Sequence, residues 1–384
     1  MPEFDEQWLR DTFTQQPQKE VANVERLIDH AVRLSESGAV PEARATLAPL
    51  APLADELVED NVRLAKIVDS ALKMLRKSER LSRMFADAVK ALVDVRADLY
   101  QAEGEFRQAA RLLQSVDVST CELTPAQQLL HVLRATQFFL AAEDFAGATM
   151  TLKQAQRLIN KVPESEAAVH VLFASCYARV ADNERRFLDA ALRYMSLSQY
   201  DSSIVPQQDA LDSLERAITC TILAKAGPRR DRVLAMLVRD DRASKLANSN
   251  MLFAVHHGRI IQPEETQKFE KMLQVHQLAT LSDGRTVLDK AVQEHNLLAA
   301  SRVYRSMRFK DMARVLSIDE RRAEEIARGL VVEGRLSARI DQVDAMIDFV
   351  DAKQGGTSEW DLAIADVCAE AADLVDLIKK RTDE

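Results

Sequence analysis

The spacing of apolar residues shifts near Gly334, and this shift restricts the folds open to residues 286–350. Before it, apolar residues recur about every 3.6 positions, the period of a helix; after it they recur every second position, the period of a strand. Thr286 stands three residues before Asp289, a spacing typical of a helix N-terminus. We therefore predict a long helix from 286, a short helix or a strand followed by a helix over 309–316, a third helix over 319–333, and a hairpin. This is the order of a winged helix.

The hairpin is expected to turn one apolar face inward. We place Leu336, Ala338 and Ile340 on the first strand, a turn at Asp341–Gln342, and a second strand with these inward residues: Val343, Ala345, Ile347 and Phe349. Asp344 and Asp348 are expected to face solvent. We expect the last strand to have an unpaired edge that can add to a neighbour's sheet, and we predict that Leu336, Ala338 and Ile340 bind a partner.

The charge of this region disfavours DNA as its partner. Residues 319–351 contain nine acidic and five basic side chains, an excess of four negative charges. A DNA-binding face needs Lys and Arg to neutralise phosphates, so protein contact is favoured. The alternative, a nucleic-acid adaptor, would require a basic stripe built from distant residues: Arg229, Arg230, Arg232 and Arg302. We interpret the cluster at 229–232 mainly as a solvated first helical turn, and otherwise as a partner for acidic groups.

A repeat built on phenylalanine precedes this region. Phe106, Phe145 and Phe187 lie 39 and 42 residues apart, each after a short polar turn, and each is followed by Ala at plus three and an apolar residue at plus seven. Such units are typical of helical hairpins that stack into a right-handed solenoid. The spacing exceeds the roughly 34 residues of a tetratricopeptide repeat, so the arrangement is only similar to one. The alternative is an irregular helical domain with coincidental phenylalanine spacing.

Composition supports a mostly helical fold. The 384 residues include only ten Gly and ten Pro, and aromatic residues make up 5 %. We predict a helical-repeat arm over 1–280 and a winged-helix part over 281–352. Residues 1–20 show little pattern and are expected to be loosely held. Helices are expected at 21–34, 56–75, 81–100, 217–226, 233–238, 246–255 and 269–278.

A final helix is predicted over 357–384, after Gly355–Gly356. Its apolar residues step by four and three in alternation, which is typical of a helix that pairs with other helices. These residues are Trp360, Ile364, Val367, Ala371, Leu374 and Ile378. We expect this seam to join a bundle between subunits, with packing against the chain's own winged helix as the alternative.

No pattern in the chain indicates an enzyme. The four Cys are far apart, and the seven His form no H-x-H or H-E-x-x-H motif. The phosphate-binding and nucleophile motifs are absent, so we predict no catalytic residue, metal or cofactor. A net charge of −9 argues against nucleic acid or an anionic membrane as partner. No apolar run approaches the roughly 20 residues of a membrane span, and the acidic N-terminus is unlike a signal peptide, so we expect a cytoplasmic and nuclear protein.

Several segments resemble the subunit-four family of the COP-nine signalosome. They are 176–180 (CYARV), 186–194 (RFLDAALRY), 220–224 (CTILA), 232–237 (RVLAML), 287–292 (VLDKAV), 294–298 (EHNLL), 333–335 (EGR) and 340–342 (IDQ). The resemblance implies a PCI module, which is a helical repeat fused to a winged helix. It implies that winged helices of neighbouring subunits associate edge to edge and that C-terminal helices gather in a bundle.

The resemblance also implies a function. The whole complex removes a ubiquitin-like modifier from cullins in cullin-RING ubiquitin ligases, and its zinc isopeptidase centre lies on another subunit. The expected role is therefore a non-catalytic scaffold. Its expected partners are the other PCI subunits, the zinc isopeptidase pair and, through the helical arm, the cullin and RING end. A related PCI subunit of the proteasome lid is the alternative within the same class.

Overall fold

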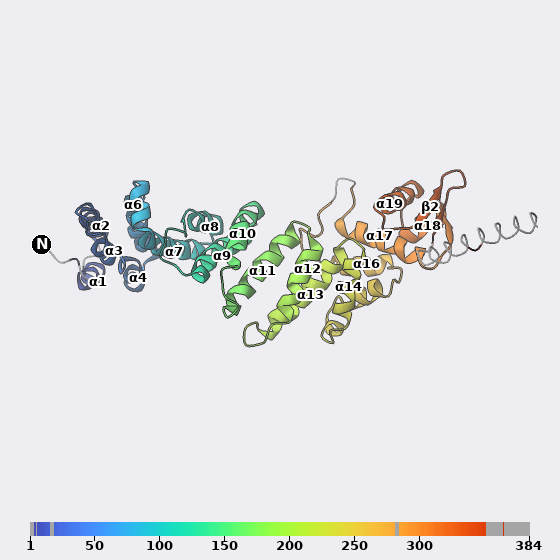
Figure 1. Ribbon diagram of the computed structural model, residues 1–384, viewed down its shortest axis with the longest axis horizontal. Helices are drawn as coiled ribbons and strands as arrows, with labels where there is room; N and C mark the ends of the chain where they lie inside the picture. Colours follow the sequence, from blue (N-terminus) through green and yellow to red (C-terminus); the bar gives the residue numbers. More distant parts are fainter. Residues whose placement is uncertain (1–3, 5, 16–18, 281–283, 351–363, 365–384) are drawn as a thin grey trace, which may run out of the picture. The chain divides into compact units, whose positions relative to one another are not determined.

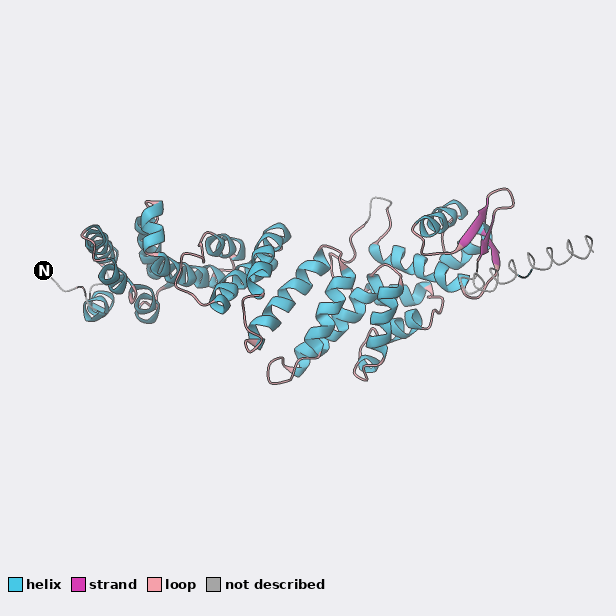
Figure 2. Ribbon diagram, viewed as in Figure 1, coloured by secondary structure: helices cyan, strands magenta, loops and turns pink. Residues whose placement is uncertain are grey.

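A computed structural model describes residues 4, 6–15, 19–280, 284–350 and 364 of the chain. The chain divides into two compact units, residues 1–213 and 214–384, and the boundary falls inside α13 (Gln207–Leu223). Among the described residues, strands occur only near the end of the second unit (Figure 2). The expected fold, helical repeats followed by a winged helix, is confirmed.

The first unit consists of successive helices (Figure 1). They are α1 (Glu6–Gln15), α2 (Glu20–Glu36), α3 (Val40–Leu47), α4 (Leu50–Leu57), α5 (Asn61–Leu75), α6 (Glu79–Met84), α7 (Ala86–Ala102), α8 (Phe106–Gln114), α9 (Pro125–Ala141), α10 (Phe145–Ile159), α11 (Ala167–Asn183) and α12 (Phe187–Ser198). Helix α7 packs on α8, α9 on α10, and α11 on α12, and each hairpin contacts the next one. One continuous apolar core runs from α1 to α11.

The phenylalanine repeat marks three equivalent turns. Phe106, Phe145 and Phe187 each begin the second helix of a hairpin. The residue two positions earlier has a left-handed backbone in every case, with φ of 79° at Gly104, 56° at Glu143 and 60° at Arg185. The next N–H always bonds to the carbonyl five residues back: Glu105 to Tyr100, Asp144 to Phe139 and Arg186 to Ala181. The Ala at plus three and the residue at plus seven are buried throughout. The sequence repeat therefore corresponds to the same turn and hairpin repeated three times in the structure.

A fourth copy of this turn lies near the N-terminus and was not predicted. Gly38 has φ of 92°, and Ala39 N donates to Leu34 O at 3.0 Å, as in the other three turns. Val40 takes the place of phenylalanine, and Ala43 and Leu47 at plus three and plus seven are buried. The signal was hidden because the first residue of the pattern is Val rather than Phe.

Sequence expectations for several helices were wrong. The helix expected over 56–75 begins only at Asn61, because residues 58–60 separate α4 from α5 and the Asp60 side chain caps α5. Residues 6–15 are not a loose lead-in, because they form α1 and bury Leu9 and Phe13 in the core. The helix expected over 81–100 is interrupted at Phe85, whose ring is buried where α6 ends and α7 begins. The helix expected over 269–278 lies earlier, over 263–270, because Pro263 and a Gln262–Glu265 capping box fix its start.

In the second unit, three helices and a short turn come before the winged-helix part. They are α14 (Pro228–Val238), η1 (Ala243–Lys245), α15 (Ser249–His256) and α16 (Pro263–Glu270), and α17 (Val287–Ser301) is the first helix of the winged-helix part. The predicted cap of α17 is present: Thr286 Oγ1 accepts from Asp289 N, and Asp289 Oδ2 accepts from Thr286 N, both at 3.0 Å. This reciprocal pair fixes where the helix begins.

The winged helix closes around its own core. After α17, which contributes Leu297 and Ala300 to this core, it comprises β1 (Ser306–Arg308), α18 (Phe309–Leu316), α19 (Glu320–Val332), β2 (Ala338–Asp341) and β3 (Met346–Phe349). Residues 309–316 form the short helix α18, the first of the two alternatives for this segment, and the strand β1 lies just before it. The sheet is antiparallel with the order β1-β3-β2. Apolar residues of both helices and the sheet share one core, which includes Phe309, Leu330 and Ile347.

Two expectations for the hairpin were wrong. Val343 is 95 % exposed rather than inward, because residues 342–345 form the turn. The Asp341 carboxylate accepts from the N–H groups of Val343 and Asp344, at 2.9 and 3.2 Å, and so lengthens that turn. The last strand, β3, is the middle strand, so the outer edges of the sheet belong to β1 and β2 instead.

Candidate protein-interaction surfaces

The outer edge of β2 offers free backbone groups. Val350 N donates to Ser337 O at 2.9 Å on the β2 side of β3, whereas Phe349 N donates to Arg305 O at 2.8 Å on the β1 side. Successive backbone groups of a strand point in opposite directions, so every second pair of facing residues is hydrogen-bonded. Ser337 and Val350 form one such pair, and the next one along β2 is Arg339 and Asp348. The backbone groups of Ala338 and Ile340 therefore point to the outer edge, where no described strand pairs with them.

The side chains of the three predicted wing residues face inward. Leu336 is 5 % exposed and belongs to the winged-helix core. Ala338 and Ile340 are half-buried and pack against the same core. The structure thus brings the three residues together, and what Ala338 and Ile340 present outward is their backbone. Strand addition would use those backbone groups, with Arg339 as the exposed side chain between them.

Helix α19, which a DNA-binding winged helix would place in the major groove, has no basic excess. It carries three Glu and three Arg, and Asp319 precedes it. The proposed basic stripe is also interrupted, because Arg230 is only 2 % exposed, whereas Arg229 and Arg232 are exposed. The interpretation of 229–232 as a solvated turn was therefore wrong for Arg230. The surface gives no support to a phosphate-binding stripe.

Arg335 connects the winged helix to the helices before it. Its Nη2 donates to Glu294 on α17 at 2.5 Å, Nη1 to Glu333 at 2.8 Å, and Nε to Ala226 O at 3.1 Å. Burial by itself lowers the pKa of Arg335, but the hydrogen bonds to the two carboxylates outweigh burial and raise it. The guanidinium is therefore charged and fully engaged, and it fixes the start of the wing against α17. Sequence reasoning did not find this contact because its partners lie far apart in the chain.

A groove in the first unit is a second candidate surface. It has a volume of about 670 Å³ and lies among α3, α7 and the segment before α9. Apolar and small residues form its floor, and Arg44 pairs with Glu122 at 2.7 Å beside it. Both charged side chains are well exposed, so this ion pair can open at little cost.

The predicted C-terminal seam falls almost entirely outside the described residues. Ile364 is helical and 55 % exposed. The other members, Trp360, Val367, Ala371, Leu374 and Ile378, lie outside the described residues. The choice between a bundle with other subunits and packing on the winged helix remains a prediction.

Among the described residues, no group of three or more His, Cys, Asp or Glu side chains is placed to hold a metal ion. Within the same residues, no helix has both the length and the apolar character that crossing a membrane requires.

Comparison with known proteins identifies the family. The family model described as "PSMD12/CSN4, N-terminal" matches residues 71–205, and the PCI domain model matches residues 266–350. COP9 signalosome complex subunit 4 of Arabidopsis thaliana is 36 % identical over 292 residues, which cover 74 % of this chain and 73 % of that protein. The chain belongs to the COP9 signalosome subunit 4 family.

Two more members of the subunit 4 family support the assignment. The Drosophila melanogaster protein is 33 % identical, with 82 % of this chain and 78 % of that protein covered. The Dictyostelium discoideum protein is 34 % identical, with 74 % and 71 % covered. The resemblance predicted from short segments is confirmed, and the two matched regions contain the phenylalanine repeat and the winged helix.

Proposed function

We propose that this chain is a non-catalytic scaffold subunit of a signalosome, and that it binds neighbouring subunits through the outer edge of β2. The relatives that it matches are subunits of such a complex by name, and a PCI domain covers the winged helix. The proposal rests on the outer backbone of Ala338 and Ile340, with which no strand in the described part of the chain pairs, at an edge whose side chains are already packed. An edge of this kind gains hydrogen bonds when another strand is added.

The segment predicted as a final helix would supply a second contact. In this proposal the apolar seam from Trp360 to Ile378 joins helices of other subunits in a bundle. The helical arm, including the groove beside Arg44, would contact the cullin and RING end of a cullin-RING ligase. The assembled complex would then remove the ubiquitin-like modifier through the zinc isopeptidase subunits, in the cytoplasm and the nucleus.

A single substitution on β2 tests the edge. Ala338→Pro removes a backbone N–H from the outer edge and leaves the hydrogen bonds between β2 and β3 in place. We expect it to reduce recovery of partner subunits in co-expression and pull-down at least tenfold. Ala338→Val is the matched control, because it keeps the N–H and adds a side chain that strands accommodate. Full recovery of all partners with Ala338→Pro would show that β2 is not the contact.

Deletion of residues 358–384 tests the second contact. The described parts of both units lie before this segment, except Ile364, so the truncated chain should still fold, as judged by circular dichroism. We expect it to leave the assembled complex. Purified alone with zinc, the full chain should leave modified cullin uncleaved; turnover by the lone chain would contradict the scaffold role.

A further inference from the structure

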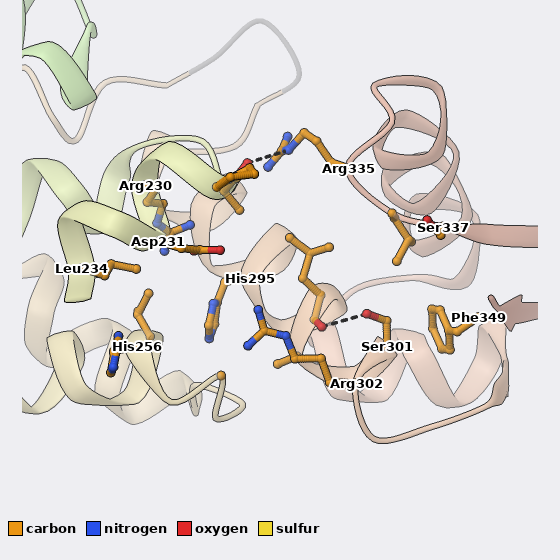
Figure 3. A pocket seen from close by; sticks show the side chains of 18 of the residues that line it. Arg230, Asp231, Leu234, His256, His295, Ser301, Arg302, Arg335, Ser337 and Phe349 are labelled. Carbon is orange, nitrogen blue, oxygen red and sulfur yellow. Dashed lines mark hydrogen bonds between the residues drawn. The ribbon is translucent and has the colours of Figure 1, made fainter. Parts of the chain in front are cut away.

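A cationic cavity lies inside the second unit, between α14, α15, α17 and the segment before β2 (Figure 3). Its volume is about 560 Å³, which is the size range of sites for small molecules. Three arginines line it, Arg230, Arg302 and Arg335, and Asp231 is the one acidic side chain among the described lining residues. This is unexpected in a chain whose net charge is −9.

Arg230 is the unusual member of this lining. Its side chain is almost wholly buried, and it makes no hydrogen bond or ion pair with any described residue. Its Nε in particular has no acceptor. Burial lowers the pKa of Arg230 to about 10, so the group is still charged at neutral pH. A buried cation without a hydrogen-bonding anion is strongly unfavourable, so this site calls for an acceptor.

The neighbouring groups do not supply that acceptor. Arg335 adds positive charge nearby, and its own donors are directed to Glu294, Glu333 and Ala226. Asp231 and Glu294 favour the charged form of Arg230 only through longer-range attraction. His295 donates from Nε2 to Arg259 O at 2.9 Å, and burial lowers the pKa of His295 to about 4, so the ring is neutral at neutral pH.

Arg302 brings a second free cation to the rim. Its guanidinium makes no hydrogen bond or ion pair with any described residue, and Figure 3 shows the guanidinium pointing toward His295, inside the same cavity as Arg230. Gly258 permits this position, because a Cβ there would lie 2.7 Å from Arg302 Nη1. The glycine therefore leaves room for the arginine to lie across the opening.

We propose that this cavity binds a compact phosphate, either inorganic phosphate or the phosphoryl group of a small metabolite, between Arg230 and Arg302. A phosphate carries several acceptor oxygens, so it can accept from the buried Nε of Arg230 and from the fork of Arg302 at once. This cavity is not the outer edge of β2. Phosphate binding there would be a function additional to the proposed scaffold role. A bound anion would also stabilise α14 against the end of α17, because Arg230 lies in α14 and Arg302 directly follows α17 as its C-cap residue.

Thermal unfolding of the full chain tests binding directly. The melting temperature is measured in 20 mM phosphate and in chloride of equal ionic strength and pH. With a dissociation constant on the order of 1 mM, phosphate should raise the melting temperature by about 3 °C. Calorimetric titrations with inorganic phosphate and with glycerol phosphate distinguish the two sources of the group. Acetate is the carboxylate probe, and we expect it to have no effect.

Two variants and one control locate the site. Arg302→Gln, at the exposed rim, should weaken phosphate binding at least tenfold. Arg230→Met should abolish the phosphate response, yet be at least as stable as the parent chain in chloride, because it replaces a buried unpaired charge with an apolar side chain of similar length. Arg232→Gln changes an exposed arginine on the same helix outside the cavity, and it should bind phosphate as the parent does.

The proposal is overturned if phosphate has no effect beyond ionic strength, or if acetate is as effective. The first result would leave the cavity without a ligand of this class, and the second would indicate an acidic peptide instead. An unchanged phosphate response in Arg302→Gln would also overturn it, and that variant decides the matter if Arg230→Met does not fold. None of these outcomes bears on partner binding by β2.

Discussion

Glu294 on α17 accepts a hydrogen bond from Arg335 Nη2 at 2.5 Å, although 41 residues separate the two in the chain. Their side chains are only 10 % and 14 % exposed. The pair therefore lies in an environment where charges interact strongly and where the loss of one partner is costly. This ion pair connects the segment before β2 to α17, the helix that lines the cationic cavity.

The first prediction concerns this ion pair. Glu294→Gln should destabilise the chain by about 2 kcal/mol, because Arg335 keeps its other acceptors but loses a buried opposite charge. Urea unfolding followed by circular dichroism measures the change. Asp311→Asn is the control, since its ion pair with Arg314 is largely exposed and should be worth less than about 0.5 kcal/mol. Equal effects of the two substitutions would contradict the assigned role.

The second prediction concerns pH. His295 has a pKa of about 4 in the folded chain because it is buried, against 6.5 when unfolded. Between these values the unfolded state binds a proton that the folded state does not, so stability falls as the pH is lowered from about 6.5 to about 4. The loss from this group is up to about 3 kcal/mol. His295→Gln keeps a donor for Arg259 O but cannot titrate, so its stability should vary less over this range. Parallel pH curves for the two chains would disprove the assignment.

The third prediction uses the repeated left-handed turns. Glu143 is exposed and has φ of 56°, a conformation that costs a residue with a Cβ about 1 kcal/mol or more. Glu143→Gly should therefore stabilise the chain by about 0.5–1 kcal/mol in urea unfolding. Gly104→Ala, at the equivalent turn, is the converse change and should destabilise by about 1 kcal/mol. The same sign for both substitutions would refute the equivalence of the turns.

The fourth prediction concerns a close approach between α9 and α10. A Cβ at Gly147 would lie 2.5 Å from Phe139 Cδ1, so Gly147→Ala should cost about 1–3 kcal/mol. Gly329→Ala is the control on α19, where a Cβ meets nothing within 4 Å, and helix propensity should make it neutral or stabilising. Adding Phe139→Leu to Gly147→Ala should recover part of the loss by making room. Additive costs in the double variant would exclude the steric explanation.

The sequence predicted those elements whose signals are local. The Thr286–Asp289 cap and the phenylalanine turns follow from neighbouring residues alone, so they were found with nearly correct positions. Strand β1, at 306–308, has only three residues, too few to show an alternating pattern, so the sequence did not predict a strand there. Val343 was predicted to face inward but lies in the turn, because the Asp341 carboxylate accepts from the N–H groups of Val343 and Asp344. Apolar periodicity does not reveal this hydrogen bonding.

The candidate sites were predicted less well, because burial depends on distant segments. Arg230 belongs to an arginine cluster that reads as solvated, yet residues near 258, 300 and 335 enclose it. Strand alternation predicted that Leu336 points inward, and its side chain lies in the core, whereas its role in partner binding stays a prediction. The sequence did not show that β3 occupies the centre of the sheet, so an open edge was expected on this last strand, whereas the outer edges belong to β1 and β2.

The position of β3 also affects how this chain is made. Both other strands pair only with β3 among the described strands, and β3 is the last of the three to leave the ribosome. Until residues 346–349 emerge, β1 and β2 each carry two open edges, which are prone to join other nascent chains. A premature stop just before residue 346 should therefore give an insoluble product, whereas a stop after 350 should not.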